Sequence, residues 1–320
     1  MAKLEQSDLD YCLEVTRRGG SNLWFVGRSL PAPRRGLFAS AYASMRVIDD
    51  FVDDDFLART ASERAAGRAD AHRRVSDWLA AMEGALAGRT GGAGNGLPDA
   101  RILNSVASLY QGADIGALPW RLLARSMHHD IDEEPFRDWD DFVVYCEGAT
   151  VAPASIFLYV VAANLEGAPA ARHRLPADPA DCVRDMAIFC YLVHIARDIT
   201  KDAAAGPALL TIPDSVLGAH GLTRSEMAAA ALREGDPRMR GLILDLAERA
   251  GDYRKRGEAW RDRLLPLLGL RERTAFSGLM AVYGALHDRL CADPDFALLH
   301  DPDKREAARR SALAAADIEI

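Results

Sequence analysis

Apolar residues recur every three or four positions along most of the chain, the spacing that gathers them on one face of an α-helix. The clearest run begins at Arg34, after the turn signal at residues 31–33, and ends near Leu57. The pattern predicts helices over residues 34–57, 62–86, 103–110, 120–127, 139–165, 181–203, 224–233, 238–265 and 273–290. Pro153 lies inside the long apolar segment 139–165, so we expect a kink there.

Composition strengthens the prediction of an all-α protein. Ala and Leu are abundant, β-branched residues are sparse and aromatic residues make up only 7% of the chain, which favours helix over sheet. No repeat or linker divides the 320 residues, so one domain over residues 1–320 is predicted, with almost no strand. A Gly-rich surface loop at 87–98 and a charged C-terminal tail at 301–320 are its expected irregular parts.

Charge and cysteine content narrow the class of protein further. The net charge of −8 argues against a nucleic-acid partner, which would need a basic stripe. Five widely spaced cysteines without a CxxC pair indicate neither a disulfide framework nor a zinc site. The N-terminus has no signal-peptide pattern and no run of about 18 apolar residues occurs. We therefore expect a cytoplasmic protein whose only membrane contact is peripheral.

The candidate chemistry begins with an acidic run at the end of the helix predicted over 34–57. Asp49 and Asp53 are four positions apart and share a helix face, where like charges repel by roughly a few tenths of a kcal/mol. Paired carboxylates suit Mg²⁺, whose remaining ligands are water and substrate phosphate. A solvated helix end is the competing interpretation of this run by itself.

A second pair repeats the same spacing. Asp198 and Asp202 follow another apolar helical run, 149 positions after the first pair. Surface acids usually alternate with bases, so two pairs that each follow a core-facing run are typical of a cavity mouth. We therefore expect the two pairs to face each other and to hold metal together.

The two acidic segments resemble those of a known family. ASAYASMRVIDDFVDD, which contains Asp49, and FCYLVHIARDITKDAAAG, which contains Asp198, are similar to the two signature segments of the squalene/phytoene synthase family, including its dehydrosqualene synthases. YCEGATVAPAS, starting at Tyr145, looks like the Tyr-Cys segment between them. The resemblance runs from about Ser21 to Leu290 and implies a single-domain isoprenoid-synthase helical fold with a central apolar cavity.

The resemblance also implies a role for each matching residue. It implies four metal ligands for Mg²⁺, with Mn²⁺ as an alternative: Asp49, Asp53, Asp198 and Asp202. It assigns Arg46 and Arg197 to the substrate diphosphate and three tyrosines to catalysis, Tyr42, Tyr145 and Tyr283. His194, one turn before Asp198, is a further candidate for binding the diphosphate. Breaking an allylic carbon–oxygen bond leaves a carbocation and a diphosphate. Metal ions neutralise the diphosphate, an apolar wall excludes water, and aromatic faces stabilise the cation. Core packing is the competing explanation for each tyrosine.

The chain departs from the family pattern around its second acidic pair. His194 and Tyr191 stand where the family usually has Asn and Gln, and Val151, Pro153 and Ala154 alter its small-residue pattern. Imidazole is a poorer Mg²⁺ ligand than an oxygen, so binding of diphosphate, binding of a transition metal and core packing all stay open for His194. If this ring serves the metal site, its protonation should matter near neutral pH.

The resemblance predicts an enzyme, a prenyl-diphosphate transferase of terpenoid, carotenoid or hopanoid biosynthesis. It would join two farnesyl or two geranylgeranyl diphosphates head to head, through a cyclopropyl diphosphate, to a squalene-like or phytoene-like product. One alternative is a relative that hydrolyses a presqualene-type diphosphate to an alcohol. Another is a non-catalytic helical binding or assembly subunit. The use of NADPH, peripheral membrane contact for product release, and the choice between monomer and homodimer stay open.

Overall fold

The computed structural model describes residues 4–19, 22–89, 97–165, 170–233, 235–299 and 301–314. Its residues group into two compact units, and three helices contribute residues to both: α9 (Pro179–Ala205), α12 (Pro237–Leu264) and α13 (Leu270–Ala292). Unit 1 comprises Met1–Glu133, Glu147–Arg184 and Arg263–Phe276, and unit 2 comprises Glu134–Cys146, Asp185–Asp262 and Ser277–Ile320. One domain over residues 1–320 stays a prediction.

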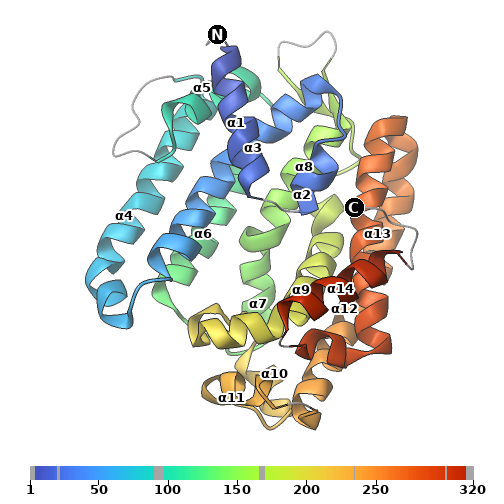
Figure 1. Cartoon of the computed structure of the whole chain (residues 1–320). Coiled ribbons are helices and arrows are strands. Elements are labelled where there is room, and N and C mark those ends of the chain that lie inside the picture. Colours follow the sequence, from blue (N-terminus) through green and yellow to red (C-terminus); the bar gives the residue numbers. More distant parts are fainter. Residues whose placement is uncertain are drawn as a thin grey trace. The chain divides into compact units, whose positions relative to one another are not determined.

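Unit 1 is a bundle of helices with one very short hairpin. Its helices are α1 (Gln6–Arg18), α2 (Asn22–Gly27), α3 (Ala32–Asp50), α4 (Ala61–Leu86), α5 (Ala100–Tyr110), α6 (Leu118–Asp132) and α8 (Ala152–Ala162). The strands β1 (Ala163–Asn164) and β2 (Arg172–His173) pair antiparallel. In Figure 1, α1 and α5 lie beside α3, and α4 runs next to α6. The prediction of an all-α protein with almost no strand is confirmed.

Helix α3 lies at the centre of unit 1. Three of the helices around it, α4, α5 and α6, donate hydrogen bonds to it. The indole N–H of Trp78 in α4 donates to the Ser44 carbonyl at 2.9 Å, and that of Trp120 in α6 donates to the Ser44 hydroxyl at 2.8 Å. The Tyr110 hydroxyl in α5 donates to the Leu37 carbonyl at 2.8 Å. These groups are buried, so their pairing avoids the cost of unsatisfied donors. Helix α3 is thereby held in one position.

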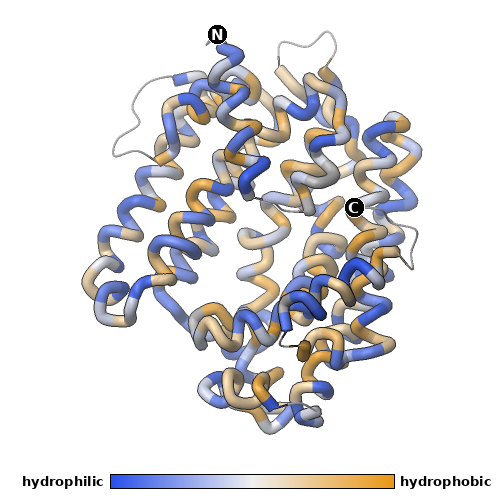
Figure 2. The backbone as a smooth tube through the Cα atoms, viewed as in Figure 1, coloured by the Kyte–Doolittle hydropathy of each residue, from blue (hydrophilic) through white to orange (hydrophobic). Residues whose placement is uncertain are grey.

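Amphipathic patterning accounts for how the outer helices pack. Figure 2 shows hydrophilic and hydrophobic residues interleaved along α4. Its buried residues Ala71, Val75, Trp78 and Met82 are spaced by three or four positions, so they form one stripe. Helix α4 begins with a capping box in which Thr60 and Glu63 satisfy each other's backbone N–H.

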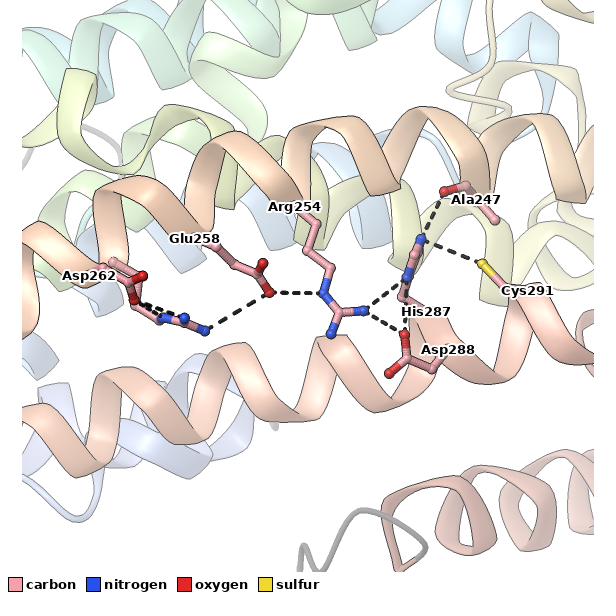
Figure 3. A network of polar contacts seen from close by, with 8 residues as sticks. Ala247, Arg254, Glu258, Asp262, His287, Asp288 and Cys291 are labelled. Carbon is pink, nitrogen blue, oxygen red and sulfur yellow. Dashed lines mark hydrogen bonds and ion pairs between the residues drawn. The ribbon is translucent and has the colours of Figure 1, made fainter.

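Unit 2 contains α7 (Trp139–Cys146), most of α9, α10 (Asp214–Ala219), α11 (Met227–Ala231), most of α12, the second part of α13 and α14 (Pro302–Ala314). Helices α12 and α13 lie side by side, and Figure 3 shows the polar contacts that join them. Arg254 on α12 pairs with Glu258 at 3.2 Å and with Asp288 on α13 at 2.5 Å. His287 Nε2 lies 2.9 Å from the Ala247 carbonyl, to which it can donate. This network fixes the register of the two helices.

Most predicted segments correspond to observed helices, although 120–127 was too short, α1 and α10 were not predicted, and two segments contain breaks. The run from 34 ends as a helix at Asp50 and continues as a π-helical turn, Phe51–Phe56. The segment 139–165 is interrupted by a π-helical turn, Glu147–Val151. Pro153 has no N–H to donate to the Ala149 carbonyl four positions earlier, which explains why helical bonding fails there. The charged tail forms α14 as far as Ala314, whereas 315–320 and most of the Gly-rich loop, 90–96, lie outside the described residues.

One stretch of the described chain, Trp139–Ala162, is long and apolar enough to span a membrane by length and composition. However, 61% of its most apolar window is buried within the protein. Core helices commonly combine such length, composition and burial, so the stretch is weak evidence for a membrane span.

Candidate active site

The first acidic pair lies where α3 ends. Asp49 is in the last turn of α3 and Asp53 is in the following π-helical turn, which contains a 2.8 Å hydrogen bond from the Leu57 N–H to the Val52 carbonyl. The C-terminal end of a helix carries partial negative charge, which disfavours carboxylates there. Acids at this position therefore need a cation nearby.

Arg46 supplies part of that positive charge. Its Nη1 donates to Asp49 Oδ2 at 2.9 Å, and its Nη2 forms an ion pair with Asp50 Oδ1. Its Nε is buried and has no hydrogen-bond partner among the described residues. The guanidinium has five N–H donors and thus binds two acids of the run without using all of them.

A single arginine does not neutralise the first acidic run. Burial raises the pKa of Asp49, and the opposing effect of Arg46 does not cancel that shift. Desolvation by the surrounding protein and the charge of Asp49 raise the pKa of Asp53. Part of the Asp53 side chain nevertheless reaches solvent. The two carboxylates therefore lie in a place that is short of positive charge.

The second acidic pair lies in the last two turns of α9. Arg197 donates from Nε to Asp198 Oδ1 at 2.8 Å and from Nη2 to Asp198 Oδ2 at 2.6 Å, a bidentate pair. The same Nη2 lies 3.2 Å from His194 Nδ1, so this imidazole nitrogen accepts. Arg197 is therefore engaged with Asp198 and His194, which fits a positioning role as well as the predicted contact with diphosphate.

The two acids of this pair have opposite electrostatic environments. Burial opposes ionisation of Asp198, but the hydrogen bonds and the charge of Arg197, together with smaller effects of His194 and Lys201, outweigh it and lower the Asp198 pKa. Burial and the charge of Asp198 raise the pKa of Asp202 to about 7. Asp202 therefore lacks the cation that Asp198 has, and a metal ion would stabilise its ionised form.

The structure alters the expectation for His194. Desolvation and the neighbouring Arg197 lower the pKa of this imidazole to about 4, although 45% of the side chain is exposed. The ring is then neutral at pH 7, with Nε2 3.4 Å from Asp198 Oδ2. The expectation that His194 titrates near neutral pH is not supported.

Four aromatic residues of unit 2, named here the aromatic row, pack in series next to His194: Phe136, Phe142, Tyr145 and Tyr191. The ring centroids of Phe136 and Tyr145 are 4.9 Å apart, and Tyr145 is 6.5 Å from Tyr191. Tyr191 stacks at 6.5 Å on His194, and Phe142 stacks on Tyr191 at 6.3 Å. The sequence identified Tyr191 only as a departure from the family, and Phe136 and Phe142 carried no signal of a site.

The other two predicted tyrosines lie near the two arginines. Tyr42 is buried, stacks on Phe38 at 5.2 Å and interacts electrostatically with Arg46. Tyr283, on the part of α13 in unit 2, interacts electrostatically with Arg197. Each acidic pair therefore has an arginine and a tyrosine close by.

Carboxylate oxygens are the donors that Mg²⁺ prefers. Within the described ranges, no group of three or more His, Cys, Asp or Glu side chains lies together in a way that could hold a metal. Mg²⁺ typically takes one or two carboxylates and completes its shell with water and phosphate. The acidic pairs, with the raised pKa of Asp49, Asp53 and Asp202, fit that mode of binding.

An apolar groove of about 360 Å³ lies elsewhere on unit 1. Its lining includes Leu9, Pro33, Leu37 and Leu109 and none of the candidate site residues. The groove is therefore not part of this candidate site.

Comparison with solved structures shows the fold. A dehydrosqualene synthase in complex with ligand is 15% identical, with a TM-score of 0.65, covering 98% of this chain and 97% of that one. The squalene synthase HpnC from Alicyclobacillus acidocaldarius is 19% identical, with a TM-score of 0.64, covering 90% of this chain and 94% of that one. TcSQS with the ligand E5700 is 12% identical, with a TM-score of 0.68, covering 98% and 87%. The predicted isoprenoid-synthase helical fold is confirmed.

Comparison with protein families identifies the chain. No curated protein gives a match. The family model described as squalene/phytoene synthase matches residues 16–310, a range that contains both acidic pairs. The chain therefore belongs to the squalene/phytoene synthase family and is a prenyl-diphosphate transferase, as its two acidic segments predicted.

Proposed function

We propose that the protein joins two farnesyl or two geranylgeranyl diphosphates head to head, through a cyclopropyl diphosphate, in a Mg²⁺-dependent reaction. Family membership supports head-to-head prenyl transfer. The observation that carries the metal-dependent form is the electrostatic state of the two acidic pairs. Three of the four carboxylates, Asp49, Asp53 and Asp202, have a raised pKa because burial and neighbouring acids disfavour their charge.

Asp49 and Asp53 would be metal ligands in unit 1, and Asp198 and Asp202 would be metal ligands in unit 2. Mg²⁺ bound there would neutralise the negative charge that develops on the departing diphosphate. The carboxylates contribute by binding and orienting the cation, and their burial strengthens that attraction. Arg197 already matches the charge of Asp198 and lowers its pKa, so a bound metal ion would stabilise the ionised form of Asp202 most.

Arg46 would bind the diphosphate directly. Its Nη1 and Nη2 are engaged with Asp49 and Asp50, while its Nε is buried without a partner among the described residues. Because Nε is covered by protein atoms, a phosphate oxygen would accept from the second N–H of Nη1 or Nη2, and such a charge-assisted hydrogen bond is stronger than a neutral one. The same guanidinium fixes Asp49, so it would position metal ligand and substrate together.

Arg197 would act mainly by positioning Asp198. Two hydrogen bonds from one planar guanidinium fix both carboxylate oxygens, which lysine cannot reproduce. His194 accepts from the same guanidinium and is neutral at pH 7. Its Nε2 can then donate to an anionic oxygen such as Asp198 or a phosphate.

The aromatic row would protect and stabilise the carbocation. Tyr191 stacks on His194, Tyr145 packs against Tyr191, and Phe136 and Phe142 support the two tyrosines. Ring faces attract cations without reacting with them as water would. We assign Tyr145 and Tyr191 to the walls along which the cation rearranges, and Tyr42 and Tyr283 to positions beside Arg46 and Arg197.

The deciding experiment is incubation with farnesyl or geranylgeranyl diphosphate and Mg²⁺, with and without NADPH, followed by mass analysis of products and by measurement of released diphosphate. We expect a C30 or C40 head-to-head product and loss of turnover in EDTA. Release of a prenyl alcohol from a presqualene-type diphosphate would instead identify the hydrolytic alternative. Absence of diphosphate release with every substrate would contradict the proposal.

Two matched pairs of variants test the metal ligands. Asp49→Asn and Asp198→Asn should reduce turnover by at least about 100-fold, since each removes a charge from the metal site. Asp55→Asn in the first acidic run and Asp181→Asn at the start of α9 alter exposed acids on the same segments and should change turnover less than about twofold. Equal losses in all four variants would mean that the effect comes from general loss of negative charge.

A further inference from the structure

The turn between α12 and α13 exposes an unusual amount of apolar surface. Among the described residues, seven large apolar side chains are exposed, and two of them lie three positions apart in this turn. Leu267 is 46% exposed and Leu270 is 80% exposed. Pro266 and Gly269 are also exposed, so these four residues form an apolar tip, named here the leucine tip.

Buried residues and a hydrogen bond fix the backbone of the leucine tip. Leu264 and Leu268 are buried and anchor the turn, which includes a short 3-10 segment, Leu265–Leu267. The Arg273 guanidinium donates to the Leu268 carbonyl at 3.1 Å. The exposed leucines therefore belong to a turn that buried side chains and a hydrogen bond hold in place.

Cations accompany the leucine tip on the following helix. Arg271 and Arg273 are exposed in the first turn of α13. Glu272, between them, is buried and forms a 2.7 Å ion pair with Arg34 on α3. The acid is therefore neutralised locally, and the tip carries positive charge on a protein whose net charge is −8.

We propose that the leucine tip inserts into the surface of an anionic lipid bilayer, with Arg271 and Arg273 at the level of the headgroups. Exposed leucines beside arginines match the two attractions that hold proteins at such surfaces, apolar burial and attraction to anionic lipid. A stable protein partner would need roughly 1,000 Å² or more of complementary surface, which a four-residue tip does not offer. A bilayer needs only the tip itself.

The leucines and the arginines should contribute differently to vesicle binding, because the leucines are neutral and the arginines are positively charged. Burying both leucines in lipid should strengthen binding at least about tenfold over a variant that lacks them. Each arginine near an anionic bilayer should strengthen binding about fivefold, and salt should weaken that contribution. Binding to purely zwitterionic vesicles should therefore be weaker than binding to anionic ones.

The test is flotation of the full chain with vesicles of phosphatidylcholine alone or with about one third phosphatidylglycerol. We expect the wild type to float with the anionic vesicles. The double variant Leu267→Ser/Leu270→Ser should bind at least about tenfold more weakly. Arg271→Glu should lose about tenfold or more on anionic vesicles and little on zwitterionic ones. Each variant alters exposed side chains, so circular dichroism should report an intact fold.

Leu232→Ser is the matched control, because Leu232 is 70% exposed and lies after α11 rather than in the turn. It should bind vesicles as the wild type does. Equal binding by the double variant, equal losses in Leu232→Ser, or no flotation of the wild type would each overturn the proposal. A change in the oligomeric state of the double variant, without a change in flotation, would identify the tip as a contact between copies. Vesicle binding needs no substrate, so this result is independent of the proposed function.

Discussion

The sharpest stability prediction concerns Asp202. Burial first, and then the charge of Asp198, raise its pKa from the ordinary 3.8 to about 7. The folded protein therefore holds this proton more tightly than the unfolded chain does. As pH rises from about 4 to about 7, the folded state pays an increasing electrostatic cost, so the contribution of Asp202 to stability falls with rising pH. Asp202→Asn removes the charge and keeps the shape, so it should stabilise the metal-free protein.

The magnitude follows from the size of the shift. One pKa unit corresponds to about 1.36 kcal/mol, so an ionised Asp202 would cost at most about 4 kcal/mol at pH 8 and about 1.6 kcal/mol at pH 5. Asp202 is partly exposed, and halving these values for solvent screening leaves about 2 and about 0.8 kcal/mol. With an unfolding entropy of about 2.1 cal/mol/K per residue, a chain of this length gains about 1.5 °C per kcal/mol. Asp202→Asn should then raise the Tm by about 3 °C at pH 8 and about 1 °C at pH 5.

The assay is thermal unfolding in EDTA at both pH values. Asp252→Asn is the control, since Asp252 is 63% exposed and pairs with an exposed lysine, Lys255. The Tm of this variant should differ from that of the wild type by less than about 1 °C at either pH. Mg²⁺ with a diphosphate analogue should raise the Tm of the wild type at pH 8 more than that of Asp202→Asn. A lower Tm for Asp202→Asn at pH 8, or an equal gain at both pH values, would refute the reasoning that Asp202 lacks a cation.

Three further predictions concern packing and the second acidic pair. Ser44→Ala should leave the Trp120 indole N–H buried without its acceptor, so the Tm measured by calorimetry should fall by about 2–4 °C. An unchanged Tm would mean that the helix relaxes and the indole N–H finds another acceptor. Gly148→Ala should be poorly folded, because a Cβ there would clash with the Leu122 carbonyl of α6; soluble expression and circular dichroism check this, and a normal fold would contradict the packing. His194→Asn should leave the pH dependence of turnover between pH 6 and 8 unchanged, since the pKa of this imidazole is about 4; a shifted profile would show that metal or substrate restores its titration.

Most helices could be predicted from periodicity because each buries one stripe of side chains. The predicted run 62–86 corresponds to α4, Ala61–Leu86, and the run 238–265 corresponds to α12, Pro237–Leu264. The predicted helix 120–127 was too short, since α6 extends from Leu118 to Asp132. Its last turns contain polar residues such as His128 and Asp130, and an apolar pattern does not detect a helix whose end is polar.

The positions of the acids within each acidic segment could also be predicted from the sequence. Which of these acids pairs with an arginine could not. Spacing placed Asp49 and Asp53 on one helix face. The residues of both acidic segments resembled the signature segments of the family. Which acid has an arginine depends on side-chain rotamers in the folded protein. Arg197 binds its neighbour Asp198 with both nitrogens, while Asp202 keeps a raised pKa.

The sequence by itself determined the helical class, the two acidic pairs and the family, because these depend on residue type and spacing along one segment. Only the tertiary structure decided which donors hold α3, which ring faces join in the aromatic row and which leucines stay exposed. Phe136 and Tyr191 are 55 positions apart along the chain yet belong to one row through Tyr145. Burial and desolvation arise from the packing of distant segments, so the pKa of His194 and Asp202 could not be predicted from their neighbours in sequence.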